Sequence, residues 1–220
     1  MSDQLPLKFP LREEFTLDRF RVGLNQELIE TAASNERVWI YGEARVGKTH
    51  LAQAICGQTE HSAFLPGKTT SPYDVDLDNY GAYRHLVIDD IDCWLGHRDV
   101  EEQLLALTET RLAAGLGFLM TGSGTPHQLS FSIDDLGSRV RSFHCMELKA
   151  LPDSEKRQWL VDEVNVRGLE LPDDVLEYLF ARIGRSQAYL VDVIEKLDFE
   201  SLAQSRKSVS YTHLTLPTKA

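Results

Sequence analysis

The sequence is short of cysteine, of long apolar runs and of basic residues. Its three cysteines, Cys56, Cys93 and Cys145, are isolated, and no CxxC pair occurs. Isolated cysteines in or beside apolar runs are typical of buried free thiols in a reducing compartment, so we expect three buried thiols and no disulfide. The seven histidines show no HExxH or other metal-ligand spacing, which argues against a histidine-based metal centre.

No stretch approaches the roughly 18 consecutive apolar residues of a membrane-spanning helix. The N-terminus also lacks the basic region and the following apolar run of a secretory signal, so we expect a cytoplasmic protein. Lysine and arginine number 23 against 34 aspartates and glutamates, and the net charge is −11. Such a surface repels a bare phosphate backbone. We therefore expect no strong direct DNA binding and favour a protein partner.

What is present is an alternation of predicted strands and helices, in a chain of 220 residues with 42% hydrophobic residues. Residues 1–22 are predicted to be extended, because Pro6 and Pro10 disfavour a helix. Asn25 is the predicted N-cap of a short helix that ends at Ala33. Beyond it, apolar and amphipathic runs predict strands at 38–41, 63–65, 86–89, 118–121 and 143–148, with helices at 48–56 and 100–114. This alternation predicts a parallel five-stranded sheet covered by helices on both faces.

The pattern changes after Leu151 and Pro152. Three amphipathic segments follow without a strand, at 153–166, 172–182 and 186–203, and they predict a small three-helix lid joined near residues 150–153. Residues 208–220 have no helical period and no acidic residue. A β-hairpin arm is one interpretation of them, but we expect a non-native or disordered tail. The predicted organisation is an N-terminal segment at 1–22, an α/β domain at 23–150, a helical lid at 151–207 and this tail at 208–220.

A complete GxxxxGK[ST] motif occupies residues 42–49, between a predicted strand and a predicted helix. The glycines of this motif let successive backbone N–H groups point at phosphate oxygens, and the helix N-terminus adds partial positive charge. The lysine reaches the β- and γ-phosphates, and the hydroxyl that follows it ligates magnesium. We therefore predict a nucleotide site that contains Gly42, Gly47, Lys48, Thr49 and His50. No NKxD segment follows the loop, which disfavours guanine nucleotides.

Asp89 and Asp90 follow the apolar run at 86–88. Charge at the end of a buried parallel strand lies at the edge where α/β proteins bind ligands. We predict that Asp89 holds Mg²⁺ together with Thr49, and that Asp90 orients the attacking water. A solvated acidic turn is the alternative interpretation. Ser123 also follows an apolar strand and could bond a γ-phosphate or its water, although such residues are ordinary turn formers too.

Two further segments allow two interpretations each. Arg139 and Arg141 follow a predicted helix start at 133–136, where an arginine usually makes a surface ion pair but can also act as an arginine finger on a neighbour's nucleotide. The chain start joins one amide side chain to three large apolar ones. Exposed apolar residues in a tail suggest an anchor for an apolar groove on a partner, whereas the alternative is packing against the chain's own domain. The anchor residues are Gln4, Leu5, Leu7 and Phe9.

Over residues 3–207 the chain resembles the Hda family, DnaA-related AAA+ proteins that inactivate the replication initiator DnaA. Residues 4–9 resemble the family's sliding-clamp-binding peptide, and residues 20–25 resemble the segment that leads into the domain near the adenine. The glycine-rich loop is Walker A, and Asp89-Asp90 is the Walker B pair. The other matching segments are sensor 1 at 121–123, box VII at 136–139 and the lid signature at 167–175.

The resemblance implies a P-loop NTPase AAA+ fold that binds ADP or ATP with Mg²⁺. It implies docking on the DNA-loaded sliding clamp (the polymerase beta subunit) and stimulation of hydrolysis of the ATP bound to DnaA, with Arg139 acting in trans as the finger. DnaA would be left in its ADP form, which prevents a second round of initiation. A homodimer is compatible with this class. A full initiator would need a further DNA-binding domain, for which we expect no room.

Two departures from the family pattern bear on catalysis. Sensor 1 is Ser123, where relatives commonly carry Asp or Asn, and the position of the sensor 2 arginine is Ala188. Arg185, about one turn earlier, is a candidate substitute for that cation. Because a missing cation weakens sensing of the γ-phosphate, we predict weak or no intrinsic ATP hydrolysis and tolerance of ADP. The rival interpretations are a helicase-loader-like AAA+ ATPase and a clamp-binding adaptor without a catalytic contribution.

Overall fold

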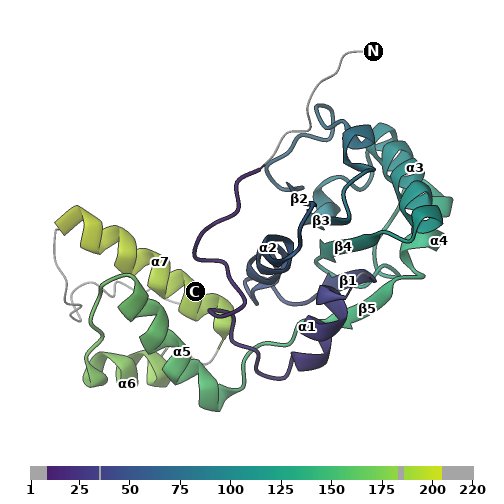
Figure 1. Ribbon diagram of the computed structural model, residues 1–220. Helices are drawn as coiled ribbons and strands as arrows, with labels where there is room; N and C mark the ends of the chain where they lie inside the picture. Colours follow the sequence, from purple (N-terminus) through teal and green to yellow (C-terminus); the bar gives the residue numbers. More distant parts are fainter. Residues whose placement is uncertain (1–8, 35, 183–185, 205–220) are drawn as a thin grey trace. The chain divides into compact units, whose positions relative to one another are not determined.

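The computed structural model describes residues 9–34, 36–182 and 186–204. The described chain divides between Lys149 and Ala150 into two units, each treated by itself. In the first unit the order of elements is α1 Gln26–Ala33, β1 Arg37–Tyr41, α2 Lys48–Gln58, β2 Ser62–Pro66, η1 Leu77–Tyr80, β3 His85–Asp89, η2 Ile91–Cys93, α3 Arg98–Ala114, β4 Gly117–Gly122, α4 Asp134–Val140 and β5 His144–Glu147, where η1 and η2 are short 3-10 helices (Figure 1).

The five strands form one parallel sheet in the order β2-β3-β4-β1-β5, which confirms the predicted fold class. Helices cover both faces, with α1 and α2 on one side and α3 and α4 on the other (Figure 1). Because every strand is parallel, the carboxyl ends of β1, β3 and β4 meet at one edge of the sheet. The loops that follow Tyr41, Asp89 and Gly122 therefore start side by side.

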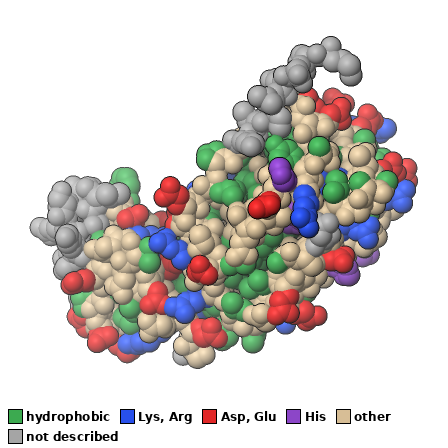
Figure 2. All heavy atoms as spheres, in the orientation of Figure 1, with side chains coloured by type: hydrophobic (Ala, Val, Ile, Leu, Met, Phe, Trp, Pro, Cys, Tyr) green, Lys and Arg blue, Asp and Glu red, His purple; other side chains and the backbone are tan. Residues whose placement is uncertain are grey.

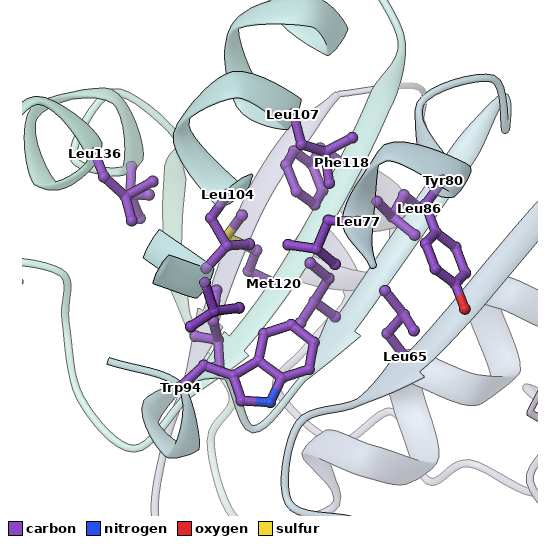
Figure 3. Close-up of a cluster of buried hydrophobic side chains, with 14 of the residues drawn as sticks. Leu65, Leu77, Tyr80, Leu86, Trp94, Leu104, Leu107, Phe118, Met120 and Leu136 are labelled. Carbon is purple, nitrogen blue, oxygen red and sulfur yellow. The ribbon is translucent and has the colours of Figure 1, made fainter. Parts of the chain in front are cut away.

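The larger core cluster lies between the sheet and α3 (Figure 3). Alternate residues of β3 and β4 point to this face, which is why Leu86, Phe118 and Met120 meet Leu104 of α3. Leu136 brings α4 into the same cluster. All five of these side chains are at most 1% exposed. The apolar face of α3, which repeats every three to four residues, thus packs against the side chains that alternate along the strands.

Two polar side chains are buried at the opposite edge of the sheet, where β3 and β4 begin. Arg111 of α3 is 1% exposed and donates to the carbonyl oxygens of Tyr83 (2.9 Å), Arg84 (3.4 Å) and Gly117. Burial lowers the pKa of its guanidinium to about 10. His85, the first residue of β3, is 2% exposed, and neither ring nitrogen has a hydrogen-bond partner. Burial, with the nearby Arg111 charge, lowers the pKa of His85 to about 4.

Asn25 precedes α1 as predicted, but its side chain does not cap that helix. Its amide instead donates to the carbonyl oxygen of Lys149 (2.9 Å) and accepts from the N–H of Lys149 (2.8 Å). This paired contact joins the segment before α1 to the chain just after β5. The predicted N-cap position was therefore correct, although the Asn25 side chain bonds a distant backbone group, which offers both a donor and an acceptor, and not the helix.

The expectation of three buried thiols was correct only for Cys56. Cys93 and Cys145 are exposed. Cys93 ends η2 beyond the buried strand β3, and Cys145 lies on β5, an edge strand with largely exposed side chains. Adjacency to an apolar run does not bury a residue that follows the run or lies on an open edge.

The second unit contains three helices, α5 Asp153–Val166, α6 Asp173–Arg182 and α7 Gln187–Gln204. Their apolar faces form a separate core that includes Leu160, Leu179 and Leu190, each fully buried. At the surface, Arg157 of α5 bonds Glu177 of α6 at 2.8 Å. The helices match the predicted three-helix lid. Among the residues described, no helix is long and apolar enough to cross a membrane.

Candidate nucleotide-binding site

The glycine-rich loop connects β1 to α2 in the conformation that its sequence requires. Gly47 has φ +111° and is the N-cap of α2, with no side chain capping the helix. A Cβ on Gly42, where φ is +157°, would lie 2.6 Å from the carbonyl oxygen of Leu148. Neither glycine can therefore be replaced without strain. No acidic residue lies in the first turn of α2, so no carboxylate there competes with an anion for the positive end of the helix dipole.

Lys48 folds back over this loop. Its Nζ donates to the carbonyl oxygens of Gly42 (2.8 Å) and Glu43 (3.1 Å). These contacts hold the ammonium group of Lys48 at the loop that would bind a phosphate. An ammonium group has three donors, so it can exchange these carbonyl bonds for phosphate oxygens with little movement.

Thr49 and Asp89 are in direct contact across the edge of the sheet. The Thr49 hydroxyl donates to Asp89 Oδ2 at 2.7 Å, and the Thr121 hydroxyl donates to Asp89 Oδ1 at 2.6 Å. Asp89 is 3% exposed, and this burial raises the pKa of its carboxyl above the usual range, against the opposing effect of the two hydroxyl bonds. Thr121 also accepts from the N–H of Asp90 at 2.9 Å. The sequence motif contained Thr121, but only the structure shows that this residue supports both aspartates.

Asp92 extends the acidic edge and was missed by sequence reasoning. Its Oδ2 accepts from the N–H of Ser123 at 2.6 Å, while its Oδ1 is buried without a hydrogen-bond partner. Burial raises the pKa of Asp92. Asp90 precedes the short η2 turn with φ +52°, a left-handed conformation uncommon for a residue with a side chain. The only signal for Asp92 in the sequence was its position, two residues after the predicted pair Asp89-Asp90.

His50 connects the phosphate-binding loop to the segment that precedes α1. Its ring stacks on Phe15 (centroids 4.7 Å apart) and meets the edge of Phe20 (5.3 Å). Its Nε2 lies 3.0 Å from the carbonyl oxygen of Thr16. A Cβ on Gly47 would lie 3.2 Å from the Phe20 ring, so that ring covers the loop itself. The structure thus brings Phe20 and His50 to the site, and it gives Phe15 a place there that the sequence did not indicate.

These residues fit a nucleoside polyphosphate with a divalent cation. The glycine-rich loop and the N-terminus of α2, which has no acidic residue in its first turn, would provide the backbone donors, and Lys48 would provide the cation. Thr49 and Asp89 would hold Mg²⁺, because hydroxyl and carboxylate oxygens are ligands that this ion prefers. The described residues contain no separate group of three or more His, Cys, Asp or Glu side chains arranged to hold a metal.

Arg139 lies away from this loop, on α4. Its guanidinium is half exposed and donates to Glu109 Oε1 of α3 at 3.1 Å. Arg141 lies over the ring of Phe131, 5.8 Å from its centroid. Both interpretations of Arg139 remain compatible with this geometry, because a half-exposed ion pair contributes little stability and is easily exchanged for another anion.

The structure describes only some of the residues predicted for the N-terminal anchor and for sensor 2. Gln4, Leu5, Leu7 and Arg185 lie outside the described residues. Phe9 is described, and it is partly buried against the larger core cluster. Its own domain therefore supplies a packing site for the last apolar residue of the anchor. Ala188 lies near the start of α7 and offers no cation there.

The fold and the site define a P-loop protein of the AAA+ class, built like DnaA. Domain III of the Thermotoga maritima replication initiation protein DnaA matches with a TM-score of 0.77 at 21% identity, over 93% of this chain and 95% of that one. AMPPCP-bound DnaA from Aquifex aeolicus matches with a TM-score of 0.67 at 21% identity, over 89% of this chain and 69% of that one. The Thermotoga maritima RuvB Holliday junction branch migration motor matches with a TM-score of 0.59 at 20% identity, over 90% and 69% of the two chains.

Residues 153–217 match the family described as "Hda, lid domain". The chain therefore resembles Hda in its lid and DnaA in its AAA+ fold, in agreement with the sequence resemblance. The match begins at the first residue of α5 and continues past the last residue that the structure describes.

Proposed function

We propose that this chain is a regulatory inactivator of DnaA that acts from the DNA-loaded sliding clamp in the cytoplasm. The observation that carries the proposal is the pairing of an Hda lid with a DnaA-type AAA+ domain in one chain. AAA+ domains of one type can contact each other as successive subunits of an assembly, with one subunit's arginine facing its neighbour's nucleotide. DnaA, which has the same fold, is accordingly the partner.

The proposed catalytic contribution is made by Arg139 in trans. As water attacks the γ-phosphorus of the ATP bound to DnaA, the bond to the bridging oxygen of ADP breaks and charge accumulates on the phosphoryl oxygens. A guanidinium placed at those oxygens stabilises that charge, and phosphate and ADP are the products. Arg139 suits this role because its present partner, Glu109, is exposed and easily displaced.

The chain's own nucleotide site has a different role in this proposal. ADP or ATP with Mg²⁺ would bind at Gly42, Gly47, Lys48, Thr49, His50 and Asp89, with Asp90 and Ser123 near the γ-phosphate. Nucleotide binding is supported by the absence of an acidic residue in the first turn of α2 and by the likeness to AMPPCP-bound DnaA. We propose weak intrinsic hydrolysis, since Ala188 provides no sensor 2 cation, and we propose that ADP mainly stabilises the folded domain.

Clamp binding is assigned to Gln4, Leu5 and Leu7, with Phe9 at the point where the peptide joins the domain. The side chains on the face drawn in Figure 2 support a protein partner over DNA, because acidic and basic residues are interspersed there among the described residues without a broad basic patch. The clamp would bring DNA-associated DnaA and this chain together without direct DNA binding. A homodimer of this chain stays a prediction.

The test is single-turnover hydrolysis of ATP pre-bound to DnaA, in the presence of DNA-loaded clamp. Wild type is compared with a Gln4→Ala/Leu5→Ala/Leu7→Ala variant, which spares Phe9 and hence the core cluster. We expect stimulation by wild type and its loss in the variant, with equal melting temperatures and equal affinity for ADP. A folded, clamp-binding wild type that gives no stimulation would overturn the proposal and favour an adaptor or a helicase loader.

A further inference from the structure

Glu101 of α3 is a fully buried carboxylate with no cationic partner in any contact the structure shows. It is 0% exposed, and its side chain accepts three backbone hydrogen bonds. Oε1 accepts from the N–H groups of Gly96 (2.7 Å) and Ser132 (3.0 Å), and Oε2 accepts from the N–H of Ile133 (2.9 Å). Neither the nucleotide site nor the core cluster accounts for this arrangement.

Two of these donors belong to the segment that starts α4. Ile133 is the N-cap of α4, and Ser132 precedes it. A helix of seven residues, Asp134–Val140, is too short to be stable alone, so its position is set by outside contacts. Leu136 and Val140 bury its apolar side in the core, and Glu101 fixes its amino end. Arg139, on the exposed side of α4, is thereby held at a defined place beside Glu109 of α3.

A carboxylate at this buried place is better explained by a role in positioning α4 than by a contribution to the stability of the domain. Burying a carboxylate is unfavourable before its hydrogen bonds are counted, and apolar residues of similar volume are often equally stabilising. What apolar packing cannot supply is directional contact with two successive N–H groups at 3.0 Å or less. Such contacts fix both the rotation of α4 about its axis and its position along that axis. A contact between two leucine side chains has no direction and leaves both free to change.

We propose that Glu101 is a positioning residue for Arg139: it holds the amino end of α4 so that the guanidinium reaches the partner's nucleotide. This inference rests on the proposed function. Arginine fingers act within a narrow geometry, and a displacement of about 1 Å at a reacting centre can cost on the order of a hundredfold in rate.

The test is a Glu101→Gln variant in the DnaA hydrolysis assay. Glutamine preserves size, but its NH₂ group faces a backbone donor where Oε1 or Oε2 accepted, so at least one bond to the α4 segment is lost. We expect the maximal stimulated rate to fall about tenfold, in line with a modest misplacement of the finger. The concentration of this chain that half-saturates DnaA, and its own affinity for ADP, should not change. Amide exchange at Ser132 and Ile133 should accelerate.

Glu102→Gln is the matched control, because Glu102 is the adjacent residue and its side chain makes an exposed contact with Arg98. It should retain the wild-type rate. Combining Glu101→Gln with Arg139→Ala should give the rate of Arg139→Ala alone, because a positioning residue has nothing left to position. If Glu101→Gln does not fold, Glu101→Asp keeps the charge on a shorter stem and carries the same expectations.

The two proposals fail in different ways. Stimulation that depends on Arg139 but is unchanged in a folded Glu101 variant with faster exchange at Ser132 and Ile133 would overturn the positioning role. A proportional loss of ADP affinity and DnaA affinity would also overturn it, since that pattern is general destabilisation. Wild type that gives no stimulation at all would overturn the proposed function itself, and the positioning role with it.

Discussion

Asp89 joins the phosphate-binding loop to the sheet through two hydroxyl donors. Thr49 belongs to α2 and Thr121 to β4, so one carboxylate is hydrogen-bonded to both elements. Thr49 and Asp89 are the groups proposed to share a magnesium ion, and their direct contact at 2.7 Å shows that they are already close enough to do so. Replacing this carboxylate should therefore weaken binding of the magnesium ion more than binding of the phosphates.

Asp89→Asn should weaken binding of the magnesium–nucleotide complex at least about tenfold, because it removes a charged ligand and one hydrogen-bond acceptor. Affinity for ADP measured with EDTA should change much less. Titration calorimetry with and without Mg²⁺ measures both constants. Asp78→Asn, an exposed aspartate of η1, is the control and should match wild type in both conditions. Equal losses with and without Mg²⁺ would contradict the assignment of Asp89 to the cation.

His85 makes stability depend on pH in a defined window. Its pKa is about 4 in the folded chain against 6.5 unfolded, because burial and Arg111 oppose the charged ring. Between these values the unfolded state binds more protons, so the free energy of unfolding rises with pH. The contribution is complete above about pH 6.5 and is lost as pH falls toward about 4, by on the order of 3 kcal/mol at most.

His85→Leu should therefore flatten the pH dependence of unfolding between these limits. The ring has no hydrogen-bond partner, so an apolar replacement leaves no group unpaired, and the variant should be more stable than wild type near pH 5. Urea denaturation at several pH values gives the difference between the two proteins, which removes the effects of the carboxylates. His127→Leu, at an exposed histidine, should follow the wild-type curve. An unchanged slope in His85→Leu would refute the buried neutral ring.

Among the elements, α3 carries two buried charged side chains that fasten segments distant in the sequence. Arg111 binds the carbonyl oxygens at the starts of β3 and β4, and Glu101 binds the start of α4. The two groups lie at opposite ends of the helix and carry opposite charges. Both bond backbone groups, which the pattern of apolar residues does not reveal.

Arg111→Met should destabilise the domain by about 3 kcal/mol, because several carbonyl oxygens at the sheet edge lose their buried donor. Methionine keeps most of the apolar stem, so the loss reflects the hydrogen bonds more than the packing. Chemical denaturation provides the measurement. Arg98→Met removes an exposed arginine of the same helix, bonded to Glu102, and should change stability by less than about 0.5 kcal/mol. Similar small effects for both variants would show that the carbonyl contacts do not hold the edge.

The elements themselves were largely predictable from the sequence. All five strands and the sheet's parallel class followed from apolar runs alternating with helices, since a buried parallel strand must be apolar along its length. The glycine-rich loop followed from its motif. Asp92, Phe15 and Glu101 could not be predicted, because their roles depend on which backbone groups and rings the chain brings to them from other elements. Asn25 illustrates the same limit, with a correct position and an unforeseen partner in Lys149.

On the scale of the whole molecule, the chain joins a proposed anchor peptide to a domain with the fold of DnaA domain III and to a helical unit that matches the Hda lid. The boundary of the anchor is drawn by Phe9, which packs against the core cluster of its own domain. We propose that the residues before Phe9 bind the partner. The domain boundary between Lys149 and Ala150 separates two units with independent cores.

Phe9→Ala should lower the stability of the first unit by about 2 kcal/mol, as expected for truncation of a partly buried ring. Leu5→Ala should leave stability unchanged and weaken clamp binding. Thermal unfolding and a clamp-binding assay on both variants separate the two effects. If Phe9→Ala loses clamp affinity without any loss of stability, Phe9 belongs to the peptide and the boundary lies further along the chain.

The most direct test is the hydrolysis of DnaA-bound ATP with Arg139→Ala, measured beside Arg98→Ala. The two arginines are matched, because each is exposed and pairs with one glutamate of α3. We predict that Arg98→Ala stimulates like wild type, whereas Arg139→Ala loses stimulation by on the order of a thousandfold, with clamp binding intact. Undiminished stimulation by a folded, clamp-bound Arg139→Ala would contradict the assignment of this chain as the source of the catalytic arginine.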